Sequence, residues 1–309
     1  MSGEKLFLLK MADLSIIIVS YNTKDLLLEC LASIKKWTKG ISYEVIVVDN
    51  ASSDGSMAAI RNLKFKIYNL KLIENLDNLG FAAANNQGIK IAKGKYILLL
   101  NSDTKLTENS LAKMLDWMEK HSQVGIASCM LKNPDGSVQA TGGFFPNLPR
   151  LFLWATLLDD IPGVGDLVGS YHPHRDSNFY REERGLDWVT GAFFLIRREV
   201  INKVGLLDED FFLYVEELEY CWRVKKAGWN IAYTPITSII HYGGASGTRS
   251  GTIYGEIKGL KLLYQKHFPF WQRLILRLLL LIGSLLRIII FTIARPTRAK
   301  IYVGALGKI

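Results

Sequence analysis

Acidic residues stand at several places in this chain where carboxylates can do chemistry. Asp49 and Asp103 each follow an apolar run, in VIVVDN and LLLNSD, and Glu216–Glu217 opens the charged segment EELEYCWR. A carboxylate can accept hydrogen bonds from a base or a ribose hydroxyl, bind a divalent cation, or remove a proton from a hydroxyl group. Strand-end turns and helix N-termini favour the same residue types for structural reasons alone. The elements around these acids decide between the two interpretations.

The first half of the chain predicts strands that alternate with helices. Segments 14–20, 43–50 and 95–103 are rich in β-branched and aliphatic residues, which is typical of strands covered on both faces. Amphipathic helical patterns follow each of them. This order predicts an α/β fold with a mostly parallel, Rossmann-like central sheet flanked by helices. Ligands bind such sheets at the carboxyl ends of the strands, where Asp49 and Asp103 are expected.

The second half is less regular. Residues 124–143 predict a strand, a turn at Pro134-Asp135-Gly136 and a return strand. Residues 144–180 predict a long loop with a short helix near 151–158, and loops of this length are often functional. A strand that leads into a helix, an acid-rich helix start and a last strand ending at His241 follow.

Four loop segments resemble those of family 2 glycosyltransferases of the GT-A fold in their order and spacing. They are VSYN (19–22), VVDNASSDGS (47–56), NLGFAAANN (78–86) and NSD (101–103). WVTGAFFLIRREV, EELEYCWRVKKAGW and HYGG follow in matching order, so the resemblance covers roughly 14–246. Within the family the chain looks most like bacterial rhamnosyltransferase-like members. The resemblance implies a nucleotide-sugar donor, a divalent cation (Mn²⁺ or Mg²⁺) and an inverting transfer to a lipid-linked or cell-surface polysaccharide acceptor.

The resemblance assigns the donor site to the four loops. Asp49 would bind the base or the ribose, with the backbone at Ser20 and Tyr21 against the base, and Gly80 would allow close approach. The donor is expected to be dTDP-rhamnose by likeness, with UDP-sugars left open. The donor-binding set is Ser20, Tyr21, Asn22, Asp49, Asn50, Asp54, Asn78, Gly80, Phe81, Asn101, Ser102 and Asp103.

The NSD segment stands where the family has two metal-binding acids separated by one residue. Asn101 replaces the first acid, so Asp103 is expected to be the charged ligand. His241 stands where related enzymes supply an imidazole ligand, which suits Mn²⁺ better than Mg²⁺. The cation would neutralise the leaving nucleoside diphosphate.

The acidic pair ahead of a helix is expected to supply the catalytic base. Family members usually have Glu-Asp there, and this chain has Glu216-Glu217. We expect Glu217 to take the acceptor proton and Glu216 to orient it or contact the acceptor. Glu219 and Arg223, one helical turn apart, are expected to pair. The expected sugar and acceptor residues are Trp188, Thr190, Gly191, Ala192, Trp222 and Arg223, whereas His172, His174 and Arg175 are read as a solvated loop.

The positive charge is concentrated at the C-terminus. The net charge of +9 and a pI near 9.3 suggest an acidic partner, and there is no acid from Lys258 onward. Segment 271–296 is apolar but carries Arg273, Arg277 and Arg287. A stripe of arginines on an apolar helix favours an anionic membrane interface over a span, which would bury Arg287. Packing on the domain or in a homodimer is the alternative.

These patterns predict a tail over 1–12, a GT-A domain over 13–250 and a basic amphipathic helical region over 251–309. The domain is expected to divide into a nucleotide-binding half (13–105) and an acceptor half (106–250). The cysteines show no CxxC spacing, which indicates a reducing compartment and no zinc knuckle. The expected location is the cytoplasmic face of the cell membrane, with no nucleic-acid partner.

Two other functions fit the sequence less well. SYNTKD after the first strand is no Gly-rich phosphate turn, which disfavours a Rossmann oxidoreductase. The incomplete metal segment and the Glu217 exchange leave a non-catalytic, nucleotide- or glycan-binding membrane scaffold of the same fold as the alternative.

Overall fold

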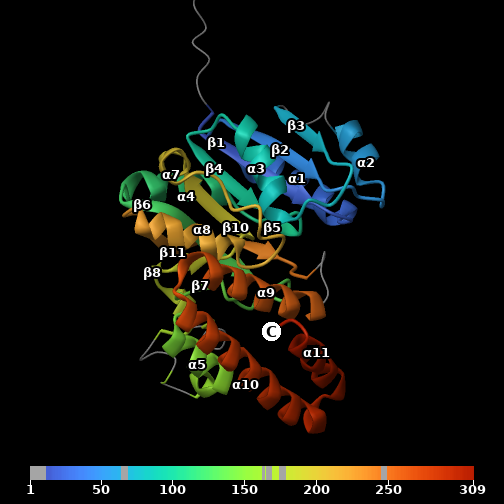
Figure 1. The fold of residues 1–309 in the computed structure, drawn as a ribbon. Helices are drawn as coiled ribbons and strands as arrows, with labels where there is room; N and C mark the ends of the chain where they lie inside the picture. The colour runs from blue at the N-terminus through green and yellow to red at the C-terminus, as the bar shows by residue number, and fades with distance from the viewer. Residues whose placement is uncertain (1–11, 64–68, 162–163, 165–168, 174–178, 245–248) are drawn as a thin grey trace, which may run out of the picture.

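The computed structural model of the chain describes residues 12–63, 69–161, 164, 169–173, 179–244 and 249–309. The predicted tail therefore lies outside the described residues except for Ala12. Within these ranges a nine-stranded sheet runs through the molecule in the order β3-β2-β1-β4-β10-β6-β11-β5, with β8 paired to β11 (Figure 1). The strands are β1 (Leu14–Ser20), β2 (Tyr43–Asp49), β3 (Leu70–Glu74), β4 (Tyr96–Leu100), β5 (Thr104–Leu106), β6 (Val124–Lys132), β8 (Arg184–Leu186), β10 (Phe193–Arg197) and β11 (Asn230–His241).

The nucleotide-binding half has the predicted alternation. Strands β3, β2, β1 and β4 are parallel, and alternate side chains of each strand enter different hydrophobic cores. Ile17 packs in the core that contains α3, whereas Ile16 and Ile18 pack in the core that contains α1 and α4. Burial on both faces explains why these strands read as continuous apolar runs. The mostly parallel GT-A-like sheet flanked by helices is thus confirmed. The helices are α1 (Lys24–Trp37), α2 (Ser56–Leu63), α3 (Phe81–Ile91) and α4 (Ser110–Lys120).

The second half adds antiparallel strands. Strand β10 lies between β4 and β6 and is antiparallel to both, while β6 and β11 are parallel. The last strand ends at His241 as predicted. The chain continues through α5 (Leu148–Thr156), α7 (Arg198–Val204) and α8 (Glu216–Lys226). Helix α5 begins three residues before the predicted short helix, because Asn147 caps its start by accepting a hydrogen bond from the Arg150 amide.

The predicted return strand after Gly136 is wrong. A single bridge joins Lys132 to Val138, and the chain then forms β7 (Gly142–Gly143), which pairs with β9 (Trp188–Val189) in a separate two-stranded sheet. Strand β10 pairs with β6 at Ile126 and Ala127, and the returning chain pairs with β6 only near its end, where the Gln139 amide also donates to the Leu131 carbonyl at 2.9 Å. The chain then leaves β6 and joins β9.

The C-terminal region is helical. It contains α9 (Arg249–His267), α10 (Phe270–Ala294) and α11 (Pro296–Leu306), which lie below the sheet in Figure 1. Ile257, Leu260 and Tyr264 of α9 share a core with Ile17 of the sheet, so α9 packs on the domain. Helix α10 contacts α5, α9 and α11. We call its solvent-exposed apolar side the outer stripe, formed by Trp271, Leu274, Leu278, Leu281, Ile282, Leu285, Ile289 and Ile293.

Arg287 does not face the surface as the predicted arginine stripe requires. It is buried, and its guanidinium donates hydrogen bonds to the carbonyls of Ala155 (3.0 Å) and Trp154 (2.8 Å) of α5 and of Gly283 (3.2 Å). At about 100° per residue, Arg287 projects from the side of α10 opposite Leu278. The prediction is wrong for this residue because backbone carbonyls of α5 satisfy the guanidinium inside the protein.

Arg287→Leu is expected to lower the free energy of unfolding by about 3 kcal/mol, because hydrogen bonds to a buried charge are lost and carbonyls are left unpaired. Urea denaturation measures this loss. Arg277→Leu is the matched control, since Arg277 is exposed on the same helix and should change the free energy by no more than about 0.5 kcal/mol. Equal losses in both variants would contradict a structural role for Arg287.

Candidate active site

A pocket opens at the carboxyl ends of β1, β2 and β4. Its walls come from the NSD loop, the N-terminus of α3, the turn before β10, the segment ahead of α8 and the residues after β11. It is lined by Val19, Tyr21, Asn50, Asn78, Gly80, Phe81, Asn101, Ser102, Asp103, Thr190, Gly191, Ala192, Phe212, Leu213, Tyr214, Glu216, Glu217, His241 and Gly244.

Most residues predicted for the site line this pocket, and some do not. The loops, the acidic pair and His241 meet there although they are far apart in sequence. The predicted residues outside the lining are Ser20, Asn22, Asp49, Asp54, Trp188, Trp222 and Arg223. The sequence reasoning missed Val19, Phe212, Leu213, Tyr214 and Gly244 as lining residues.

The loops after β1 and β2 hold each other in place. Asp54 accepts hydrogen bonds from the amides of Lys24 and Ser56, and Asn22 accepts one from the Ser53 amide. These side chains therefore connect loops rather than line the pocket. Asp49 accepts a hydrogen bond from the Ser52 amide at 2.9 Å through Oδ2.

The Oδ1 atom of Asp49 is buried and has no hydrogen-bond partner among the described residues. A buried acceptor of this kind needs a donor. A base N–H or a ribose hydroxyl reaching past the lining residues is such a donor.

Gly80 serves the protein's own backbone. It has a φ of +83°, and a Cβ there would lie 2.3 Å from the Phe212 carbonyl oxygen. The amide of the next residue, Phe81, donates to this carbonyl at 2.7 Å. The glycine expected to admit the donor thus also lets segment 206–215 dock on the N-terminus of α3. This contact explains why Phe212 and Tyr214, which carry no signal in the sequence, line the pocket.

Asp103 and His241 lie side by side at the end of the NSD loop. Their Oδ1 and Nε2 atoms are 3.3 Å apart, and Asn101 Nδ2 is 3.4 Å from the same imidazole nitrogen. Gln139 Oε1 lies 2.8 Å from His241 Nδ1, an acceptor that suits a proton on Nδ1 and would leave Nε2, beside Asp103, as the ligand atom.

A carboxylate with an imidazole is a donor set that fits Mn²⁺. Among the described residues there is no group of three or more His, Cys, Asp or Glu side chains around it. The remaining ligands of a cation would be diphosphate oxygens and water.

Glu216 and Glu217 begin α8 at the far wall of the pocket. The Oε2 atom of each is buried and has no hydrogen-bond partner within the described ranges. Burial, together with the charge of Glu217, holds the pKa of Glu216 well above its usual value. Burial also raises the pKa of Glu217, while the Gly191 amide and His172 act in the opposite direction. A carboxylate with a raised pKa in a pocket has the properties of a general base.

His172 is not a solvated side chain. Its Nε2 lies 2.7 Å from Glu256 Oε1 of α9, and its ring packs against Trp188 with centroids 5.5 Å apart. The other residues of the predicted solvated cluster, His174 and Arg175, lie outside the described residues. Glu256 follows the last of the family-like segments, so no local pattern pointed to it.

The remaining predicted acceptor residues have structural partners. Arg223 pairs with Glu219 at 2.8 Å, which confirms the predicted pairing, and Trp222 packs edge-on against Phe145. Trp188 is buried in the two-stranded sheet against Tyr171. Thr190, Gly191 and Ala192 do line the pocket.

Residues 15–205 match the family model described as "Glycosyl transferase family 2". The chain belongs to glycosyl transferase family 2. This glycosyltransferase therefore takes its sugar from a nucleotide-sugar donor. The match ends before Glu216 and His241, so their roles rest on their position in the pocket.

Two curated relatives are similar over most of the glycosyltransferase. It is 26% identical over 248 residues to the N-acetylglucosaminyl-diphospho-decaprenol L-rhamnosyltransferase of Mycobacterium tuberculosis, covering 74% of this chain and 76% of that one. It is 25% identical over 246 residues to the low-salt glycan biosynthesis hexosyltransferase Agl10 of Haloferax volcanii, covering 78% and 71%.

Two solved structures share the fold. The mannosyltransferase PcManGT from Pyrobaculum calidifontis, in complex with GDP-Man and Mn²⁺, superposes with a TM-score of 0.58 at 17% identity, over 96% of this chain and 74% of that one. GalNAc-T7 with UDP, GalNAc and Mn²⁺ gives 0.59 at 18% identity, over 82% and 48%. At these sequence identities the two structures show a shared fold and nothing about the substrates of this glycosyltransferase.

Proposed function

We propose that the chain is an inverting, metal-dependent glycosyltransferase that adds a sugar to a lipid-linked or cell-surface polysaccharide acceptor. One observation supports this most strongly. The acidic pair at the start of α8 and the Asp103–His241 pair line the same pocket. Direct displacement at an anomeric carbon needs a base for the acceptor and a stabilised leaving diphosphate, and the pocket offers residues for both.

In the proposed reaction Glu217 accepts the proton of the acceptor hydroxyl. The acceptor oxygen forms a bond to the anomeric carbon while the bond from that carbon to the diphosphate oxygen breaks. Asp103 and His241 would hold the divalent cation, which neutralises charge on the departing diphosphate. Glu216, buried beside Glu217, keeps water from the base and fixes its direction.

The first donor to test is dTDP-rhamnose. Its support is the similarity to an L-rhamnosyltransferase, whose name also gives a decaprenol-diphosphate-linked acceptor. A thermal-shift panel of dTDP-, UDP- and GDP-sugars with Mn²⁺ identifies the nucleotide, and a transfer assay with Mn²⁺ or a chelator then tests the reaction. Thermal stabilisation by UDP-sugars alone would replace dTDP by UDP as the proposed donor nucleotide. The absence of transfer from any stabilising donor would favour the non-catalytic scaffold.

The outer stripe of α10 supports attachment to a membrane. Residues Phe270–Ile293 are long and apolar enough to cross a membrane, judged by length and composition. The inner side of the same helix is packed on α5 and α11 and buries Ser284 and Arg287. A helix with a protein-covered polar side and an exposed apolar side suits an interfacial position. We propose that the enzyme binds an anionic membrane surface through the outer stripe, on the cytoplasmic side of the cell membrane.

Replacing both Leu278 and Ile289 by Glu is expected to reduce binding to phosphatidylglycerol-containing vesicles at least tenfold. These side chains are 55% and 65% exposed, and burying each in lipid contributes about 1.5–3 kcal/mol. Vesicle flotation measures the change. Ile236→Glu, an exposed apolar residue of β11, is the matched control and should float like the parent chain. Equal flotation of all variants would remove the outer stripe as the membrane contact, and resistance of the parent chain to alkaline extraction would identify a span.

A further inference from the structure

The two residues ahead of the acidic pair have left-handed backbone conformations. Tyr214 has a φ of +71° and Val215 a φ of +73°. Left-handed conformations are uncommon for residues other than glycine, and a β-branched residue such as Val215 is a true outlier there. Val215 immediately precedes Glu216, the first residue of α8. Such a turn persists only where its surroundings hold it in place.

Helix α9 provides these surroundings. A Cβ on Gly255 would lie 2.3 Å from Tyr214 Cδ2, and one on Gly259 would lie 2.6 Å from Val215 Cγ2 and 2.9 Å from the Tyr214 carbonyl oxygen. The Tyr214 hydroxyl is 2.9 Å from Thr252 Oγ1. The left-handed turn therefore rests on one face of α9, which is made of Thr252, Gly255 and Gly259.

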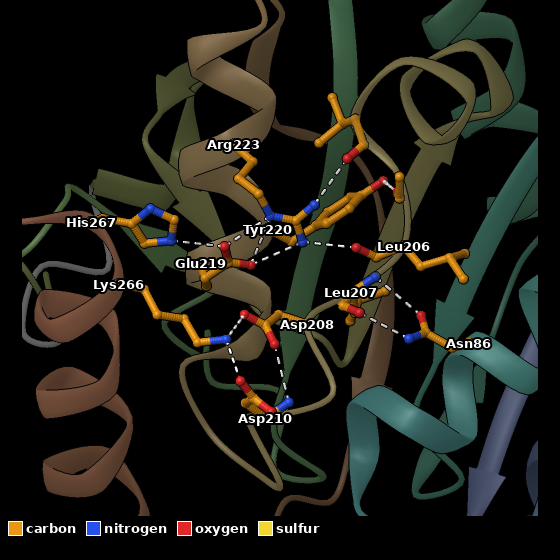
Figure 2. Close-up of polar contacts among 12 residues, drawn as sticks. Asn86, Leu206, Leu207, Asp208, Asp210, Glu219, Tyr220, Arg223, Lys266 and His267 are labelled. Atoms are coloured by element: carbon orange, nitrogen blue, oxygen red, sulfur yellow. Dashed lines mark hydrogen bonds and ion pairs between the residues drawn. The ribbon is translucent and has the colours of Figure 1, made fainter.

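The C-terminal end of α9 is tied to the segments on both sides of this turn. Figure 2 shows Lys266 between Asp208 and Asp210, with both ion pairs at 2.5 Å. His267 contacts Glu219 Oε1 at 2.9 Å. These contacts fix α9 against the chain that enters the turn and against the helix that leaves it.

Arg223 completes the connection. It pairs with Glu219, whose side chain is 1% exposed, and donates to the Leu206 carbonyl (2.8 Å), as Figure 2 shows. It also donates to the Val204 carbonyl (3.1 Å). The start of segment 206–215, α8 and α9 are thus joined by the partly buried contacts of Arg223 and His267 and by the more exposed ion pairs of Lys266. The turn that they enclose has little freedom to move away from α9.

We infer that α9 is the positioning element for the acidic pair, and that Gly255 and Gly259 hold the Tyr214–Val215 turn that directs Glu216 and Glu217 into the pocket. This inference rests on the proposed function, in which Glu217 is the base. Helix α9 lies beyond the matched residues 15–205, and all but its first two residues lie beyond the predicted domain end at 250. The inference gives the C-terminal region a role in positioning the acidic pair, in addition to the proposed membrane contact.

Gly259→Ala in the full chain tests the inference. The new methyl group must displace Val215, so we expect turnover to fall at least 30-fold with an unchanged KM for the donor, whose loops lie in the other half. Gly283→Ala is the matched control, because a Cβ added at this helical glycine of α10 would lie 3.1 Å from Ala155, which is not a lining residue of the pocket. It should keep turnover within about twofold of the parent.

A double variant that compensates for the added methyl group distinguishes loss of positioning from general destabilisation of the protein. Val215→Gly removes the Cγ2 and Cβ atoms that the new methyl group would meet at 2.6 and 2.7 Å, and glycine tolerates a positive φ without strain. The Tyr214 carbonyl oxygen at 2.9 Å remains, so the recovery is expected to be partial. The double variant Gly259→Ala/Val215→Gly should turn over at least tenfold faster than Gly259→Ala alone. Failure of this recovery, with a folded and donor-binding protein, would overturn the inference.

A readout that needs no sugar transfer separates this inference from the proposed function. The Glu217 carboxyl interacts electrostatically with Glu216, with Tyr171 and His172, with Glu256 of α9 and with Cys221 of α8. Carbon-13 NMR of Glu-labelled protein, assigned with Glu216→Gln and Glu217→Gln, follows the titration of both carboxyls. Gly259→Ala should lower both pKa values towards the usual range because the carboxyls reach water. Unchanged pKa values would overturn the inference even if no donor supports transfer, and a shift would support it in that case.

Discussion

Glu217→Gln is expected to lower kcat for sugar transfer by about 100- to 10,000-fold while the protein stays folded and binds nucleotide. The amide has the shape of the carboxyl but cannot accept the acceptor proton. Initial rates with a nucleotide sugar and an acceptor measure the loss, and the unfolding midpoint and the nucleotide-induced thermal shift check the fold. Retained turnover would remove Glu217 as the base.

The matched control for this change is Glu182→Gln. The side chain of Glu182 is 79% exposed and lies outside the pocket, so its variant should transfer sugar at the parent rate. Glu216→Gln is informative as well. If Glu216 only orients Glu217, the Glu216→Gln variant should lose less kcat than the Glu217→Gln variant.

The pH profile of kcat gives the same residue a second signature. Burial raises the pKa of Glu217, and only the deprotonated carboxylate can take a proton. Turnover should therefore rise with pH through a pKa above the usual glutamate value. An acid limb at an ordinary glutamate pKa, or one that persists unchanged in Glu217→Gln, would contradict the assignment.

Asp103→Asn is expected to abolish the stimulation of transfer by Mn²⁺ and to lower kcat/KM by at least about 100-fold. The variant keeps the side-chain shape but removes the only charged ligand that the NSD loop offers to a cation, whose neutralisation of the diphosphate contributes several kcal/mol. Transfer rates over a Mn²⁺ titration and direct Mn²⁺ binding by electron paramagnetic resonance measure the effect. Undiminished Mn²⁺ stimulation would place the cation elsewhere.

Asn101→Asp is the matched opposite change. It supplies the acid that the family resemblance implies at this position, beside His241 in the structure. A second carboxylate should lower the Mn²⁺ concentration needed for half-maximal rate in the presence of donor. Replacing His241 by Ala should weaken Mn²⁺ dependence less than Asp103→Asn, since it removes a neutral ligand.

The sequence predicted those features that short apolar runs and their ends determine. Strands β1, β2 and β4 are buried on both faces, so their apolar runs were recognisable in the sequence, and the carboxyl end of β4 located Asp103 at the pocket. Asp49, expected there at the end of β2, is not among the lining residues, whereas its neighbour Asn50 is. The sequence did not predict that β10 lies antiparallel between β4 and β6. Pairing of distant strands depends on which edges remain free, and no local pattern records this.

The rest of the pocket depends on contacts between residues far apart in the chain. Phe212 reaches the pocket because Gly80 leaves room for its backbone, and Tyr214 is held by α9. The pairing of Glu219 with Arg223 was predictable from helical spacing. The contact of Glu219 with His267 was not, because His267 belongs to another helix. Gly255 and Gly259 on one side of α9 were the signal for close packing, although they do not say what packs there.

The two sides of α10 restrict how the enzyme can meet a bilayer. Arg287 is bound by carbonyls of α5 on the inner side, and Leu278 faces outward on the opposite side. If the helix rolled about its axis it would pull a guanidinium out of its bonds and turn the apolar side chains from lipid to water. When the outer stripe lies in lipid, the enzyme therefore has a single rolling angle, and the mouth of the pocket stands at one fixed tilt above the surface. Acceptors would be selected by the height of their sugar above the lipid as well as by its chemistry.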